Sequence, residues 1–158
     1  MIRIIACGKI KEKWLKEGIE EYTKRIRPYD KIEIIEVADS PSKESDSLAM
    51  REKVKEEEGE RLLKQIKEDE FVILLDLAGK EKDSEALADF IQSLYNQSQN
   101  KIVFVVGGSL GVSPAVIKRA NFRWKLSPNT FPHQLCRLIL VEQISRAFKI
   151  LHHEPYHK

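Results

Sequence analysis

The chain has 158 residues and a mass of 18.3 kDa, which favours one domain (residues 1–158) with a substantial core. Hydrophobic residues make up 42% and charged residues 33% of the chain, and the net charge is only +2, a balance that excludes a disordered protein. No apolar run reaches the length of a membrane span, and no secretory signal precedes the first predicted strand, so we expect a cytoplasmic protein without a membrane partner.

Strand patterns alternate with helical patterns along the whole chain. The predicted strands, rich in Ile and Val, are residues 2–7, 31–37, 71–77, 101–106 and 123–126. The predicted helices are residues 11–27, 45–67, 84–98, 113–120 and 132–151, with approximate ends. Asp46 or Ser47 is expected to cap the second helix. This alternation predicts an α/β fold with a mostly parallel sheet flanked by helices.

Loops that contain Gly or Pro follow three of the predicted strands. Gly79 follows the third strand, Gly107 and Gly108 follow the fourth, and "SPNTFP" (residues 127–132) follows the fifth. Ligands of open α/β sheets bind beyond the carboxyl ends of the strands, so we expect these loops to form one pocket. The glycines do not form a dinucleotide or P-loop motif, because the spacing and the position along the fold differ. Turning a tight corner is their alternative role.

The charge is unevenly distributed. Residues 118–158 contain eight Lys and Arg against two Glu, a net charge of +6, and they also hold all four His. Such asymmetry indicates an anionic partner near the C-terminal region, with solvated helix faces as the alternative explanation. The two cysteines, Cys7 and Cys136, lie far apart in apolar settings and form neither a disulfide framework nor a metal spacing.

Three segments carry a resemblance to a known family. The segment from Leu126 to Lys158, "LSPNTFPHQLCRLILVEQISRAFKILHHEPYHK", together with "FVVGGSLG" and "IACGKIKEKW", resembles the RlmH family of the SPOUT superfamily over essentially the whole chain. The resemblance implies S-adenosylmethionine-dependent methylation of N3 of a pseudouridine in 23S rRNA on the assembled ribosome. It also implies a homodimer and a SPOUT-type sheet with a deep trefoil knot in the C-terminal half.

The resemblance also assigns cofactor-binding positions. A glycine lets the main chain approach a ligand closely, and the two apolar side chains at the ends of the last loop can form walls for an adenine. The proline inside this loop restricts the conformations of the unbound loop, which lowers the conformational entropy lost when a ligand binds. The positions implied for S-adenosylmethionine are Leu75, Gly107, Leu126, Ser127, Pro128, Asn129, Thr130 and Phe131.

Catalysis requires the loss of a proton from N3, and three side chains are candidate bases. His157 and Tyr156 belong to the C-terminal tail, and His133 begins the last helix, where it could instead cap the helix or bind phosphate. Lys158 is expected to hold RNA phosphate. A zinc site is not expected, because no paired ligand spacing recurs.

Arg137 and Arg146 are expected on the polar side of the last helix. Each could bind RNA phosphate or pair with Glu142 across a dimer interface. The apolar stripe of this helix, which includes Ile144 and Phe148, is broader than packing on one sheet face requires and predicts a dimer interface. A dimer would let the tail of one subunit reach the pocket of the other.

Three alternatives to this function are compatible with parts of the sequence. A ribosome-associated binding protein would use the basic surfaces without a cofactor. A nucleotide-dependent oxidoreductase would need an acidic ribose ligand after a glycine loop on the first strand, which "ACGKIKEKW" does not offer. A related SPOUT enzyme could methylate tRNA instead of rRNA.

Overall fold

A five-stranded parallel sheet forms the centre of the structure, which is a computed structural model describing residues 1–158. The strands lie in the order β2-β1-β4-β3-β5, and every neighbouring pair is parallel. This confirms the predicted α/β fold with a mostly parallel sheet. In chain order the strands are β1 (Ile2–Cys7), β2 (Ile32–Val37), β3 (Phe71–Glu81), β4 (Ile102–Val106) and β5 (Phe122–Lys125).

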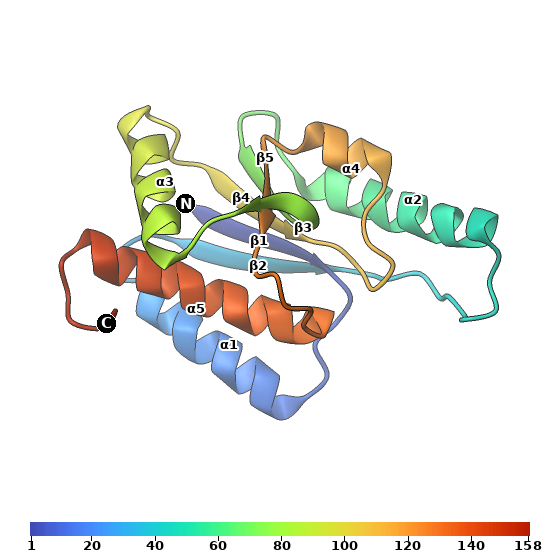
Figure 1. Cartoon of the computed structure of the whole chain (residues 1–158), viewed down its shortest axis with the longest axis horizontal. Coiled ribbons are helices and arrows are strands. Elements are labelled where there is room, and N and C mark those ends of the chain that lie inside the picture. The colour runs from blue at the N-terminus through green and yellow to red at the C-terminus, as the bar shows by residue number, and fades with distance from the viewer.

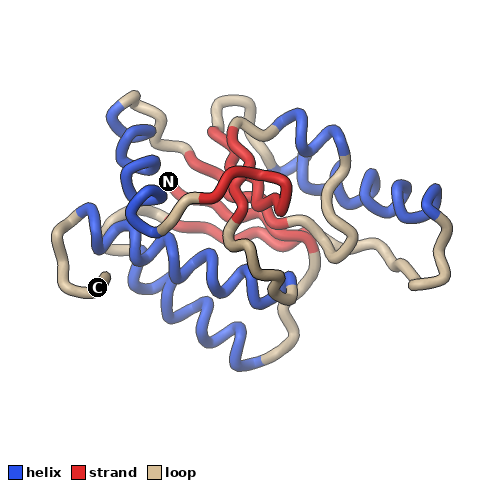
Figure 2. Tube along the Cα trace, viewed as in Figure 1, coloured by secondary structure: helices blue, strands red, loops and turns tan.

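Helices cover both faces of this sheet, and the strands lie between them (Figure 2). Helices α1, α3 and α5 cover one face, and α2 and α4 cover the other (Figure 1). All five predicted helices are present. Their bounds are α1 (Lys13–Ile26), α2 (Leu48–Gln65), α3 (Ser84–Asn96), α4 (Pro114–Arg119) and α5 (His133–Leu151).

Alternation along the central strands divides the core into two parts. In β1, Ile2, Ile4 and Ala6 join the larger hydrophobic cluster under α1, α3 and α5, whereas Ile5 and Cys7 join the smaller cluster under α2 and α4. Successive side chains of a strand point to opposite faces, so a strand that is covered on both faces is apolar throughout. This explains why β4 is a continuous apolar run in the sequence and why β1 is interrupted only by Arg3, which is buried and donates to Glu70.

The start of α2 confirms one of the two predicted caps. Ser47 accepts a hydrogen bond from the N–H of Met50 through its hydroxyl oxygen, at 3.2 Å. Asp46 instead accepts from the N–H of Lys43 within the preceding turn, at 2.8 Å.

Strand β3 extends beyond its predicted end at residue 77. Its pairing with β5 shifts register between Leu75 and Lys80, so residues 76–79 form a bulge and Leu75 precedes this bulge instead of ending the strand. Gly79 lies in the bulge, where an added Cβ would come within 2.5 Å of the carbonyl oxygen of Arg123. The prediction that Gly79 belongs to a ligand loop is therefore wrong, because this glycine lets β3 approach the backbone of β5.

Candidate active site

A cavity of about 430 Å³ opens at the carboxyl ends of β3, β4 and β5, beside the first turn of α5. Its volume lies within the range of about 300–1,000 Å³ that is usual for small-ligand pockets. Two of the three predicted loops, those after β4 and β5, line this pocket, whereas the third contribution comes from residues 75–77 within β3 and not from Gly79. The other lining segments are residues 106–112, residues 126–131 without Pro128, and His133 and Cys136 of α5.

The glycine loop, residues 107–112, is packed tightly against the protein. Gly111 has a φ of +97°, and its N–H donates to the carbonyl oxygen of Gly108 at 3.1 Å. An added Cβ at Gly107 would overlap with Cγ1 of Val112, and one at Gly108 would lie 2.7 Å from Oε1 of Glu58. A side chain at Gly107 would thus displace Val112, one at Gly108 would displace the end of the Glu58 side chain, and the same loop lines the pocket.

Replacing Gly107 with valine is expected to abolish ligand binding and also to lower the melting temperature, because the new side chain overlaps Val112. Calorimetric titration with S-adenosylmethionine and thermal unfolding measure the two effects. The double variant Gly107→Val/Val112→Ala removes the overlapping atom. Recovery of binding in the double variant would identify Gly107 as a packing corner, whereas continued loss would indicate that the loop backbone contacts the ligand.

The bulge of β3 brings an oriented carboxylate to the pocket. Oδ2 of Asp76 accepts from Nε of Arg123 at 2.7 Å, and Oδ1 accepts from the N–H of Ala78 at 2.9 Å. Asp76 is the one carboxylate among the lining residues, and Leu77 beside it is 69% exposed. The sequence analysis missed Asp76, because the bulge that turns it toward the cavity has no clear sequence signal.

The loop from Leu126 to Phe131 supplies a mixed apolar and polar wall. All its residues line the cavity except Pro128, which is exposed outside it. Within the loop, the N–H of Asn129 donates to the hydroxyl oxygen of Ser127 at 3.0 Å. The other backbone N–H groups of this loop donate to no protein acceptor. They are therefore available to the polar edge of a ligand that lies between apolar walls.

The first turn of α5 closes the pocket. His133, one of the predicted candidate bases, lines it, as does Cys136, which the sequence analysis treated only as an isolated cysteine. Burial raises the pKa of the Cys136 thiol, which therefore stays protonated near neutral pH. Proximity in the sequence to "SPNTFP" is the signal by which Cys136 could have been assigned to the pocket.

Arg137 is buried, so its predicted position on the polar side of α5 is wrong. Only 1% of the residue is exposed. Its guanidinium donates to Glu36 at 2.5 Å and to the carbonyl oxygens of Cys7 and Gly8 at 3.3 and 3.0 Å. Burial lowers the pKa of this guanidinium, and the Glu36 carboxylate opposes that effect. Arg137 thus joins the pocket end of α5 to the ends of β1 and β2 and is not accessible to RNA phosphate.

The C-terminal tail packs on the far end of α5. Arg146 donates to Glu142 of its own helix at 3.0 Å, and its guanidinium lies 4.6 Å from the ring centre of Tyr156. The ring of His157 lies 3.1 Å from the same guanidinium and 3.5 Å from Glu85. The tail rings are therefore partly buried, whereas the sequence analysis expected them to be exposed. Arg146 pairs with Glu142 within one chain.

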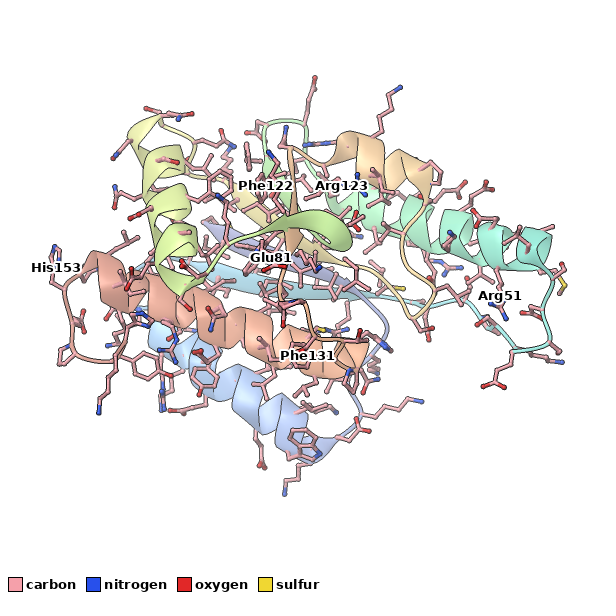
Figure 3. All side chains as sticks on the ribbon, viewed as in Figure 1. Arg51, Glu81, Phe122, Arg123, Phe131 and His153 are labelled. Carbon is pink, nitrogen blue, oxygen red and sulfur yellow. The ribbon has the colours of Figure 1, made fainter.

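The pocket and the tail lie at opposite ends of α5. Phe131 precedes the helix and His153 follows it, and the two are well separated in Figure 3. A helix of 19 residues is about 28 Å long at 1.5 Å per residue. Among the three candidate bases, the structure therefore brings only His133 to the pocket of the same chain. Lys158 is exposed at the end of the tail.

The apolar stripe of α5 is mostly used within its own chain. Leu140, Val141, Ile144 and Ala147 are completely buried, and Phe148 is 2% exposed and stacks on Tyr29. These side chains belong to the cluster shared with α1, α3 and the sheet. The breadth of the stripe thus follows from packing on three neighbours, and it does not by itself indicate a dimer interface.

Ile144→Ala is expected to lower the free energy of unfolding by about 2–5 kcal/mol, because the truncation leaves a cavity in the core. A charged residue at the same position is expected to unfold the subunit rather than to separate a dimer. Urea denaturation with light scattering measures both properties, and a folded monomeric Ile144→Asp variant would contradict this assignment.

No group of three or more His, Cys, Asp or Glu side chains is arranged to hold a metal ion. No helix combines the length and the apolar character that crossing a membrane requires.

Comparison with known proteins identifies the family. Residues 1–157 match the family described as "Predicted SPOUT methyltransferase". The chain belongs to the SPOUT methyltransferase family. It is 54% identical to a Bacillus pumilus protein and 53% identical to a Carboxydothermus hydrogenoformans protein, over 157 residues and 99% of each chain. Both relatives are named "Ribosomal RNA large subunit methyltransferase H".

A solved structure supports the same fold. A Haemophilus influenzae protein described as a probable methylase family protein superposes with a TM-score of 0.53, at 15% identity, over 99% of this chain and 70% of that one. The expected family and enzyme class are confirmed, and this SPOUT methyltransferase requires a methyl donor. The alternatives of a cofactor-free binding protein and a nucleotide-dependent oxidoreductase are wrong.

Proposed function

We propose that this SPOUT methyltransferase transfers a methyl group from S-adenosylmethionine to N3 of a pseudouridine in 23S rRNA on the assembled ribosome. The observation that carries the proposal is the pocket lined by β3 and by the loops after β4 and β5, in a chain about half identical to ribosomal RNA large-subunit methyltransferases. Leu75, Gly107 and all of residues 126–131 except Pro128 line that pocket. These are positions that the family resemblance assigns to the cofactor.

The chemistry of the pocket fits this cofactor. S-adenosylmethionine supplies an electrophilic methyl group on a sulfonium centre, so the protein mainly has to bind, align and exclude water. Leu126 and Phe131 provide apolar walls for an adenine, and the free backbone N–H groups between them provide donors for its edge. Asp76 provides an acceptor suited to ribose hydroxyls or to a cationic group.

Removal of the N3 proton is assigned to the C-terminal tail of a second subunit. Tyr156 and His157 lie at the end of α5 that is remote from their own pocket. A homodimer in which two α5 helices run antiparallel would place each tail at the pocket of the other subunit. His133, which already lines the pocket, is the alternative base.

The RNA-binding assignment is revised by the structure. Arg146 and Lys158 remain the proposed phosphate contacts, since Arg146 is partly exposed and Lys158 is exposed. Arg137 is not proposed as a phosphate contact, because its side chain is buried between α5 and the ends of β1 and β2. We also propose that residues 1–158 form one domain, that the C-terminal half is threaded as a deep trefoil knot, and that the enzyme acts on ribosomes in the cytoplasm.

Cysteine labelling tests the position of the pocket. At alkaline pH, which offsets the raised pKa of the Cys136 thiol, iodoacetamide is expected to modify Cys136 and not Cys7, because Cys136 lines the cavity whereas Cys7 is 1% exposed with its pKa raised to about 12 by burial. Saturating S-adenosylmethionine is expected to slow the modification of Cys136, as followed by peptide mass spectrometry. Equal labelling with and without the cofactor would contradict the assignment.

Transfer of a labelled methyl group tests the proposed substrate. The purified enzyme is incubated with radioactive S-adenosylmethionine and with unmodified 70S ribosomes, free 23S rRNA or tRNA. We expect label in the 23S rRNA of the ribosomes and much less in the two other substrates. Preferential labelling of tRNA would instead support the related SPOUT activity considered in the sequence analysis.

A further inference from the structure

Glu58 of α2 is a buried carboxylate with no role in the site described so far. It is 5% exposed and lies between three segments near the carboxyl edge of the sheet. Its Oε2 accepts a hydrogen bond from the backbone N–H of Ser40 at 3.0 Å. Cys7, at the end of β1, adjoins it, and the pKa of that thiol is raised to about 12 by burial and by the Glu58 carboxylate. The carboxylate therefore lies in a poorly solvated region.

The second oxygen of this carboxylate is directed at the glycine loop. Oε1 is buried and receives no N–H or O–H hydrogen bond, and the weakly donating thiol of Cys7 is the other polar group beside this carboxylate. It is the nearest atom to an added Cβ at Gly108, at 2.7 Å. An unpartnered buried carboxylate oxygen is costly, and such groups persist mainly where function requires them. The N–H of Ser109, in the same loop, has no protein acceptor either.

Helix α2 approaches the whole 107–113 segment closely. An added Cβ at Gly59 would overlap with Oγ of Ser113, which accepts the N–H of Val116 at the start of α4. Glu58 and Gly59 thus contact the loop at its beginning and at its end. Helix α2 therefore forms the support of this loop.

We propose that Glu58 is a positioning residue for the cofactor pocket: its Oε1 accepts a backbone N–H of the glycine loop when S-adenosylmethionine is bound, which fixes the loop in its binding conformation. The inference rests on the proposed function. Glu58 does not line the pocket and acts only through the loop. Its loss should therefore raise the KM for the cofactor and leave kcat at saturating cofactor nearly unchanged.

The variant Glu58→Gln tests this with little change in shape. Glutamine has a single acceptor oxygen, which the Ser40 N–H retains, so its NH₂ group faces the glycine loop. We expect the dissociation constant for S-adenosylmethionine, measured by calorimetry, to rise about tenfold, because a change of this size corresponds to the loss of one hydrogen bond. The value of kcat at saturating cofactor should change less than about twofold. The matched control is Glu57→Gln, which removes one acceptor of the Ser40 hydroxyl and should bind as the wild type.

A folded Glu58→Gln variant that binds the cofactor as tightly as the wild type would overturn the proposal, as would an equal loss in Glu57→Gln. If Glu58→Gln fails to fold, a second pair of variants decides. Gly108→Ala presses a methyl group against Oε1, so its effect on binding should be smaller in a Glu58→Ala background than in the wild type. Equal effects in both backgrounds would overturn the proposal.

Failure of the wild type to bind S-adenosylmethionine would instead overturn the proposed function, and with it this inference.

Discussion

Deletion of residues 155–158 is expected to lower the rate of methylation by about 100-fold or more while cofactor binding stays intact, because general-base catalysis typically contributes 10²–10⁴-fold. The deletion removes exposed or half-exposed contacts of Tyr156 and His157 with Arg146 and Glu85, so the free energy of unfolding should change by less than about 1 kcal/mol. Single-turnover assays on ribosomes lacking the modification measure the rate. If the truncated enzyme methylates at the wild-type rate, the tail has no role in catalysis.

Two further variants separate the possible roles of the tail. His157→Ala should reproduce most of the loss at saturating ribosome concentration if His157 is the base. If His157 only holds phosphate, the loss should disappear at saturation, and the salt dependence of binding should weaken. Lys158→Ala is the control for a phosphate contact alone.

Mixing of subunits tests whether the tail acts across a dimer. A tail-deleted subunit keeps its pocket, and a Gly107→Val subunit keeps its tail. Each variant alone should be inactive, and mixed dimers should regain activity, because the tail of one subunit can serve the pocket of the other. If verified mixed dimers remain inactive, the tail does not act at the pocket of the other subunit.

Replacement of Arg137 with alanine is expected to destabilise the protein by about 3 kcal/mol, because it removes the donors to two buried strand-end carbonyl oxygens and the ion pair with Glu36, which keeps only the Ile10 N–H. It should also weaken cofactor binding, since Arg137 follows His133 and Cys136 by one helical turn or less and anchors that turn to the sheet. Urea denaturation and calorimetric titration measure the two effects.

Two comparisons sharpen this test. Arg137→Lys should recover only part of the stability, because an ammonium group cannot span the acceptors that the planar guanidinium reaches. Arg146→Ala removes a partly exposed arginine from the same helix and should cost less than about 1 kcal/mol. Equal stability of the Arg137→Ala and Arg146→Ala variants would show that Arg137 has no structural role.

The order and type of all ten elements could be predicted from the sequence, because the strands are short runs rich in Ile, Val and Phe that alternate with helical patterns, and the central strand β4 is apolar throughout. The bulge in β3 could not be predicted, since Ala78 and Gly79 have the composition of a loop after a strand, whereas the strand resumes at Lys80 in a shifted register with β5. Gly79 was misassigned for that reason. Its role depends on the backbone of Arg123, which is distant in sequence.

The pocket was predictable in outline and the long-range contacts were not. Loops after neighbouring parallel strands meet at one edge of the sheet, which placed Gly107 and residues 126–131 together. Whether a polar side chain on α5 faces solvent or the sheet depends on which neighbours cover the helix. The partners of Arg137 lie in β1, β2 and the residue after β1, about a hundred residues or more away. Glu58 gave no signal because its neighbours on α2 are also charged.

Mass spectrometry of 23S rRNA from a strain that lacks this protein tests the central claim most directly. We expect that one pseudouridine loses a single methyl group, and that expression of the wild-type chain, but not of the chain without residues 155–158, restores it. A 23S rRNA with an unchanged methylation pattern in the deletion strain would contradict the proposed function.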